Sequence, residues 1–192
     1  MLGALRGRTD VFGYTDIFKI DELGNIIKGS SSGHMPPDGD SYGWILSHGM
    51  TGTSPILVPT PCVNTVGLYD ERLVWAADLD YMLRLAERFE ISVVREPLYG
   101  YRIHAQRTTS RMETLVREVS ETKVLEAHLK RNWSRLDDTQ RFRVIRRIQR
   151  AAIMSKNVPN LMRWVTNWTF VKGASTRAFR RIQYKRQPDS DV

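Results

Sequence analysis

The sequence predicts an α/β unit, with a mixed sheet and flanking helices, over residues 1–108 and an α-helical extension over residues 109–192. Runs rich in aromatic and β-branched residues, typical of strands, punctuate the first part. From Met112 onward the apolar residues recur at the three- and four-residue spacing of helices. With 192 residues, 41% of them hydrophobic, the chain is long enough for one ordinary domain with appendages.

The first elements form a strand, a turn and a returning strand. Residues 11–20 (VFGYTDIFKI) predict the strand, and residues 21–25 (DELGN) predict the turn. Ile26 and Ile27 begin the return. Residues 28–41 (KGSSSGHMPPDGDS) predict a flexible loop, because glycine, serine, proline and aspartate favour turns and bury no core.

Helix and strand patterns then alternate up to the boundary near residue 108. Residues 42–48 predict a short helix, and residues 56–58 a short buried strand between two prolines. Residues 79–89 predict a helix with one apolar face formed by Leu79, Met82, Leu83, Ala86 and Phe89. Residues 91–94 predict a strand, and residues 97–103 a second, separate extended segment.

Three helical segments are expected in the extension. The first has an apolar face of Met112, Leu115, Val116, Val119 and Leu129. The second spans residues 139–155, with Phe142, Ile145, Ile148 and Ala152 opposite Arg143, Arg146, Arg147 and Arg150. The third, over residues 160–171, carries Leu161, Trp164, Val165 and Trp168. These patterns predict a helical rear with a basic surface.

Charge divides the chain in the same way. Residues 1–105 carry 9 Lys+Arg against 13 Asp+Glu, and residues 106–192 carry 20 against 8, so net charges of −4 and +12 make the total of +8. A basic rear favours nucleic acid, phospholipid headgroups or a phosphorylated substrate as partner, although solvated helix faces give the same count. The single Cys62 excludes internal disulfides and a cysteine-based zinc site.

Two carboxylates, Asp78 and Asp80, stand in the first turn of the helix predicted over residues 79–89. The free backbone N–H groups and the helix dipole favour acidic residues there, which alone accounts for both. Residues two apart on a helix point in different directions. Asp80 has Arg84 four residues later as a partner, whereas Asp78 has Met82. Asp78 is therefore the better candidate for a carboxylate that faces a cleft.

Several short motifs follow one another in a characteristic order. They are Gly67-Leu68-Tyr69-Asp70-Glu71, Ala77-Asp78-Leu79-Asp80, Arg84, Pro97-Leu98 and Tyr101-Arg102-Ile103-His104. Their order and spacing resemble the C-terminal half of the catalytic domain of family 2 glycosyltransferases, over about residues 10–110. The resemblance implies a partial GT-A-like mixed sheet, which forms the acceptor side of that domain over residues 1–108.

The resemblance also implies roles for particular residues. Asp78 matches the catalytic carboxylate that takes a proton from the acceptor hydroxyl in an inverting transfer. Asp80, Arg102 and His104 match substrate-binding positions, the last two near the departing nucleotide diphosphate. A divalent metal, Mn or Mg, is expected from the family, with His104 as a candidate ligand.

The implied activity is transfer of a sugar from a nucleotide-sugar donor to a glycan or lipid-linked acceptor, in polysaccharide biosynthesis. Two departures from the family pattern qualify it. Ala77 replaces the glutamate that usually precedes the base, and no Asp-x-Asp metal motif of the family's kind precedes Val11. We therefore expect a fragment: either a truncated reading frame or a half-enzyme that another chain completes.

The sequence predicts a cytoplasmic protein, in contact with the inner face of the membrane. Its first residues are too short in apolar length for a signal peptide, and no apolar run approaches a membrane span. The basic and tryptophan-containing residues 156–186 resemble a helix in a membrane interface, although a tryptophan-filled core stripe fits equally well. The alternatives to an enzyme are a non-enzymatic basic nucleic-acid- or membrane-binding module and an inactive scaffold. Nucleic acid is disfavoured, since no recognition motif is present.

Overall fold

A computed structural model of the chain describes residues 2–5, 7–29, 35–50, 55–73, 75–104 and 114–154. These residues form a mixed α/β structure with a small open sheet of four strands. The strands are β1 (Val11–Ile20), β2 (Ile26–Lys28), β3 (Ile56–Leu57) and β4 (Glu90–Arg102). The helices are α1 (Leu2–Leu5), α2 (Tyr42–His48), α3 (Thr60–Val66), α4 (Ala77–Arg88), α6 (Thr114–Arg131) and α7 (Asp138–Met154), with a 3-10 turn, η1 (Trp133–Arg135).

The sheet is built around β1. The strand β4 pairs with it in parallel along its whole length, whereas β2 and β3 pair with it antiparallel. A strand has two edges, so β2 and β3 share the edge that β4 leaves, β3 at Gly13 and Tyr14 and β2 at Lys19 and Ile20. The predicted strand, turn and return over residues 11–27 are therefore confirmed. The turn is held by Asp21, whose carboxylate accepts hydrogen bonds from the Leu23 and Asn25 backbone N–H groups.

The two extended segments expected over residues 91–94 and 97–103 are one strand, β4. Its register against β1 shifts on both sides of Asp16, where extra residues of β4 bulge out of the ladder. The Thr15 side chain bridges this irregular stretch, since its hydroxyl donates to the Glu96 carbonyl at 2.5 Å and accepts from the Leu98 N–H at 3.3 Å. Pro97 lacks a backbone N–H for a ladder hydrogen bond, so the sequence pattern predicted two separate segments.

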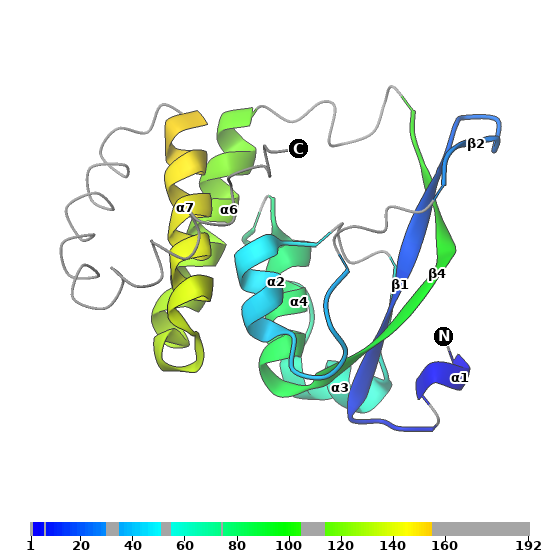
Figure 1. Cartoon of the computed structure of the whole chain (residues 1–192), viewed down its shortest axis with the longest axis horizontal. Coiled ribbons are helices and arrows are strands. Elements are labelled where there is room, and N and C mark those ends of the chain that lie inside the picture. Colours follow the sequence, from blue (N-terminus) through cyan, green and yellow to red (C-terminus); the bar gives the residue numbers. More distant parts are fainter. Residues whose placement is uncertain are drawn as a thin grey trace, which may run out of the picture.

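The predicted helix at residues 42–48 is confirmed as α2, and the one at residues 79–89 as α4, which begins two residues earlier. Helix α3 was not predicted; it begins after Pro59 and has Pro61 in its first turn, where proline is well tolerated. The expected buried strand at residues 56–58 is a half-buried pair, Ile56–Leu57. In Figure 1, α2 and α4 lie between the sheet and the long helices α6 and α7.

One hydrophobic core joins the sheet, the middle helices and the long helices. It includes Phe12 and Tyr14 from β1, Ile45 and Leu46 from α2, Leu83 and Leu85 from α4, Leu125 and Leu129 from α6, and Ile145 and Ile148 from α7. The boundary drawn near residue 108 falls in residues 105–113, outside the described part of the chain. On either side of it, the described residues share this single core.

The apolar face predicted for α7 is confirmed, because Phe142, Ile145, Ile148 and Ala152 are all buried. The face predicted for α6 is partly wrong. Two of its five residues, Met112 and the side chain of Leu115, lie outside the described part of the chain. Leu129 is buried as expected, but Val116 and Val119 are only half-buried, and the buried stripe lies one turn further on, at Thr122, Val124, Leu125 and His128. The segment expected over residues 160–171 lies outside the described residues.

Candidate functional site

The candidate site lies where the chain enters α4. The loop 67–73 leads toward this helix, and Ala76 directly before it has a backbone φ of 64°, the left-handed conformation. A residue with a Cβ atom pays about 1–2 kcal/mol for this conformation, so the surrounding structure must hold it in place. Asp78 in the first turn is exposed, and its Oδ1 atom accepts a hydrogen bond from the Leu79 backbone N–H at 2.8 Å. Its exposure meets the first requirement for a carboxylate that acts on a substrate.

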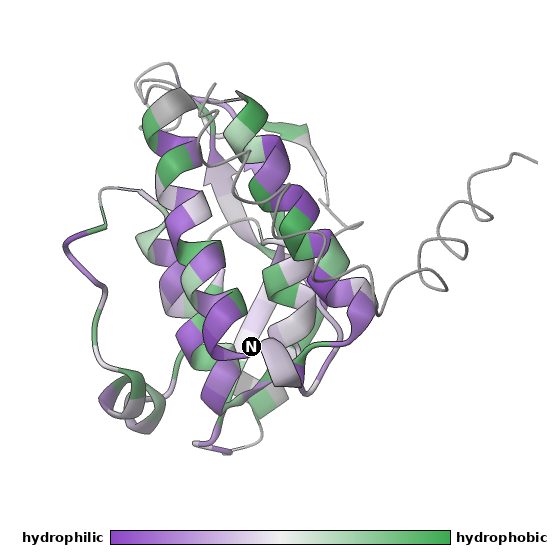
Figure 2. Cartoon of the chain, turned by 90° about the vertical axis from the view of Figure 1, so that its left-hand side faces the viewer, coloured by the Kyte–Doolittle hydropathy of each residue, from purple (hydrophilic) through white to green (hydrophobic). Residues whose placement is uncertain are grey.

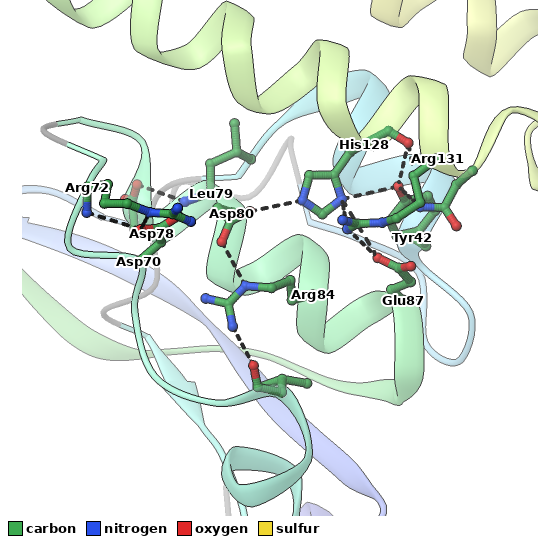
Figure 3. Close-up of polar contacts among 12 residues, drawn as sticks. Tyr42, Asp70, Arg72, Asp78, Leu79, Asp80, Arg84, Glu87, His128 and Arg131 are labelled. Carbon is green, nitrogen blue, oxygen red and sulfur yellow. Dashed lines mark hydrogen bonds and ion pairs between the residues drawn. The ribbon is translucent and has the colours of Figure 1, made fainter.

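Asp80 points the other way (Figure 3). Its Oδ1 atom lies 3.1 Å from Nε2 of His128, and its Oδ2 atom accepts a hydrogen bond from Nε of Arg84 at 2.7 Å. The expectation that Arg84 neutralises Asp80 on its own helix is confirmed. Burial works to raise the pKa of Asp80, but the hydrogen bonds from His128 and Arg84 outweigh it and hold the pKa of this carboxyl below its usual value. Whether Asp80 also binds substrate stays a prediction.

Arg84 extends from α4 to the loop 67–73. Its Nη1 atom donates to the Val66 carbonyl at 2.5 Å, and its Nη2 atom donates to the Leu68 carbonyl at 2.9 Å. The guanidinium carbon also lies 5.3 Å from the centre of the Tyr81 ring, on which Tyr69 of the loop stacks at 4.5 Å between ring centres. The loop is thus attached to α4 by one arginine and one pair of aromatic rings.

Within the loop, Asp70 and Arg72 form a local ion pair at 2.9 Å. The hydrogen bonds that the Arg72 side chain and backbone donate lower the pKa of Asp70 to about 2. The Leu73 N–H donates to the Asp70 carbonyl at 3.1 Å, which closes a turn. Asp70 is therefore a charged, turn-forming residue, as its place in the Gly67–Glu71 motif suggests.

A polar junction of five residues joins three helices and was not predicted. It consists of Tyr42 on α2, Asp80 and Glu87 on α4, and His128 and Arg131 on α6 (Figure 3). Arg131 donates to Glu87 at 2.7 Å, and its Nη2 atom lies 3.1 Å from Nδ1 of His128. The Tyr42 hydroxyl donates to the His128 carbonyl at 3.2 Å, and burial with the nearby Glu87 charge raises the pKa of this phenol. The sequence signal for the junction was one histidine on an apolar helix face.

The residues expected at the nucleotide end of the site lie at the end of β4. Arg102 is exposed, and its Nη1 atom donates to the Asp21 and Glu22 carbonyls at 3.2 and 2.6 Å, so it supports the β1–β2 turn. His104 is half-buried and follows β4. Within the described residues, no hydrogen bond or ion pair connects Asp78 with Arg102 or His104. The structure therefore does not join these residues directly, and their binding roles stay predictions.

The described residues do not form a cluster of ligands for the metal that the resemblance implies. Among the described residues, no group of three or more histidine, cysteine, aspartate or glutamate side chains could hold a metal ion. His104 accordingly has no set of described partner ligands, and the chemistry considered below runs through no metal. Among the described residues, no helix is both long enough and apolar enough to cross a membrane.

Comparison with known proteins does not assign a function to this site. Neither a scan of protein-family models nor a search of curated proteins found a match. The site can be stated in chemical terms as one exposed carboxylate at a helix start, next in sequence to a left-handed residue and a tethered loop. An exposed carboxylate of this kind can accept a proton or bind a cation.

Proposed function

We propose that this chain forms the acceptor side of an inverting glycosyltransferase, with Asp78 as the general base. The donor is a nucleotide sugar, and the acceptor is a glycan or a lipid-linked sugar. The observation that carries the proposal is the separation of the two carboxylates at the start of α4. Asp80 is engaged by His128 and Arg84, whereas Asp78 is exposed at the position that the resemblance assigns to the base.

The proposed reaction is a single displacement. An acceptor hydroxyl oxygen attacks the anomeric carbon of the donor sugar and forms the new glycosidic bond. The bond between that carbon and the nucleotide diphosphate breaks at the same time, and the diphosphate leaves with the electron pair. Asp78 takes the proton of the acceptor hydroxyl as the bond forms, which removes positive charge from the transition state.

The loop 67–73 supports this assignment of roles. It carries the Gly67–Glu71 motif and is tethered by Arg84, while Ala76 holds a strained conformation directly before the helix that presents Asp78. Strained backbone and fixed loops are common next to reactive groups, because a fixed geometry shortens the search for the reactive arrangement. The donor site is not identified in the described residues, so a partner chain that supplies it remains part of the proposal.

The test is a transfer assay with a panel of nucleotide sugars, with and without manganese, on the chain alone and in extract of its source. Asp78→Asn is expected to lower turnover by about 100-fold or more, the range that general bases contribute. Asp10→Asn, an exposed aspartate that pairs with Arg8 just before β1, serves as the control and should keep wild-type turnover. Turnover retained by Asp78→Asn would remove the basis of the proposal.

A membrane-surface role for the helical rear is a second candidate, and the exposed face of α7 favours it. Arg143, Arg146 and Arg150 are exposed along this helix, and Figure 2 shows many hydrophilic residues on the side of the molecule that carries α6 and α7. Each arginine near an anionic membrane contributes about 1 kcal/mol of attraction. We infer peripheral contact at the cytoplasmic face, with residues 156–186, outside the described part, as a further contact.

Sedimentation with liposomes tests this second candidate. Vesicles that contain anionic lipid should bind the protein at low salt, and vesicles of neutral lipid should not. Replacing Arg143, Arg146 and Arg150 together by glutamine should remove about 3 kcal/mol of attraction and weaken binding by roughly 100-fold. Equal binding to neutral vesicles, or no effect of the triple replacement, would contradict the contact through α7.

A further inference from the structure

The attachment of the loop 67–73 depends on Arg84, and the orientation of Arg84 depends on Asp80. Its guanidinium makes three hydrogen bonds at once, to the Asp80 carboxylate and to the carbonyls of Val66 and Leu68. A guanidinium can do this because its donors form a rigid planar fork. Asp80 orients that fork, so the position of the loop is set by the position of Asp80.

Asp80 is in turn oriented from the C-terminal part of the chain. The imidazole of His128 on α6 is almost fully buried, with 1% of its side chain exposed, and its Nε2 atom faces Oδ1 of Asp80 at 3.1 Å. Because Arg131 can only donate, Nδ1 is placed to accept from it, and Nε2 is the nitrogen that donates to Asp80. The contacts of Nδ1 with Arg131 and of Nε2 with Asp80 together fix the orientation of the ring.

These contacts form a continuous chain of three side chains. It begins at His128 on α6, passes through Asp80 and Arg84 on α4, and ends on the backbone carbonyls of residues 66 and 68. His128 is buried and Asp80 and Arg84 are partly buried. Such a hydrogen-bonded chain has few alternative arrangements, because each partner left unpaired would lose its compensation for burial. The loop and the start of α4 are therefore held together from the side of α6.

We propose that His128, Asp80 and Arg84 form a positioning relay, through which α6 sets the geometry of the loop 67–73 beside Asp78. The relay acts on the loop and does not itself touch the reacting atoms. Its meaning for catalysis rests on the proposed transfer reaction, but its effect on the loop does not. The two ideas can therefore fail separately.

Hydrogen exchange of single amides measures the relay directly. Three backbone N–H groups of the loop donate hydrogen bonds. That of Gly67 donates to the Val63 carbonyl of α3, that of Arg72 to the Asp70 carboxylate, and that of Leu73 to the Asp70 carbonyl. Arg84→Lys keeps the charge but loses the fork, so these three amides should exchange at least about tenfold faster. Arg88→Lys, an exposed arginine four residues later on the same helix, is the matched control and should leave them unchanged. Exchange unaltered in Arg84→Lys would overturn the relay.

His128→Gln tests whether the effect starts on α6. It should speed hydrogen exchange of the same three amides. The double variant with Arg84→Lys should exchange no faster than Arg84→Lys alone, because both changes break the same chain of hydrogen bonds. Leu129→Ala, a buried neighbour on α6, controls for general loss of stability, and should accelerate core amides of α7 without selecting the loop. If His128→Gln does not fold, Asp80→Asn takes its place in the cycle. Additive increases in the exchange rate, or loop amides that keep the wild-type rate in His128→Gln, would overturn the role of His128.

Activity then separates the relay from the proposed function. If the wild-type chain transfers sugar, Arg84→Lys and His128→Gln should lower kcat more than they raise KM for the donor, because they disturb the reactive geometry. Asp78→Asn should lower turnover by about 100-fold or more while the loop amides keep wild-type exchange. Wild-type protein without transfer would count against the glycosyltransferase alone, since the exchange results stand without it.

Discussion

The two aspartates in the first turn of α4 share a helix and a residue type but have opposite surroundings. Asp78 is exposed and accepts a local hydrogen bond from Leu79. The Asp80 side chain is 18% exposed and lies between a buried histidine and an arginine. A separation of two residues turns the second carboxylate to a different side of the helix. The Asp78 carboxylate thus faces solvent, whereas the Asp80 carboxylate pairs with other side chains.

An acidic pair at a helix start can hold two carboxylates with different roles. The backbone N–H groups and the helix dipole favour both residues equally, so the local pattern cannot assign their roles. Neighbours distant in sequence decide, because His128 is 48 residues from Asp80. The inward carboxylate should carry stability and the outward one should not, which can be measured.

The largest expected effect on stability is that of Asp80→Ala. It leaves His128 and Arg84 without their partner, and we expect the free energy of unfolding to fall by about 2–4 kcal/mol. Urea denaturation followed by far-UV circular dichroism measures it. Asp78→Ala on the same helix is the matched control and should cost less than about 1 kcal/mol, the scale of one exposed helix-start charge. Equal losses in the two variants would break the distinction between the carboxylates.

Acidification should weaken the inward carboxylate selectively. Because the pKa of Asp80 in the folded state is lowered from 3.8, its contribution to stability is present above that value and is lost as the pH falls through the folded pKa. The stability difference between wild type and Asp80→Asn should therefore shrink in acid. Urea denaturation between about pH 7 and pH 2 measures this difference. A difference that stays constant would show that protonation of Asp80 is not linked to folding.

A smaller loss is expected from Tyr42→Phe. The Tyr42 hydroxyl accepts a hydrogen bond from the Asn132 amide at 2.8 Å and donates to the His128 carbonyl, and the ring is fully buried. Removing the hydroxyl should cost about 1–2 kcal/mol through the partners it leaves unpaired. Thermal denaturation measures the loss, with Tyr101→Phe at a half-buried position of β4 as control. A neutral result would mean that the polar junction is held by Asp80, Glu87 and Arg131 without the tyrosine.

Local pattern was sufficient for the elements whose character lies within one segment. The strand β1 and helices α2, α4 and α7 were predicted, because residue composition and helical spacing are complete within one segment. The pair of Asp80 and Arg84 was predicted for the same reason, since four residues on a helix bring the two side chains together.

Other features needed contacts between distant segments. The continuity of β4 depends on its parallel ladder with β1, some 80 residues away, which carries the strand through Pro97. The buried stripe of α6 was placed wrongly, because its true position depends on where α2, α4 and α7 meet it. The predicted functional roles of Arg102 and His104 likewise depend on residues that the local motif does not contain.

The mixed α/β character of the chain, its charge asymmetry and the pairing of Asp80 with Arg84 could all be predicted from the sequence alone. These follow from periodicity and spacing along one segment, where neighbouring residues have a fixed geometry. Long-range packing places the described helices of the rear on the core of the sheet and brings His128 to Asp80. Such contacts close loops of tens of residues, and the free energy of burying many side chains at once selects them.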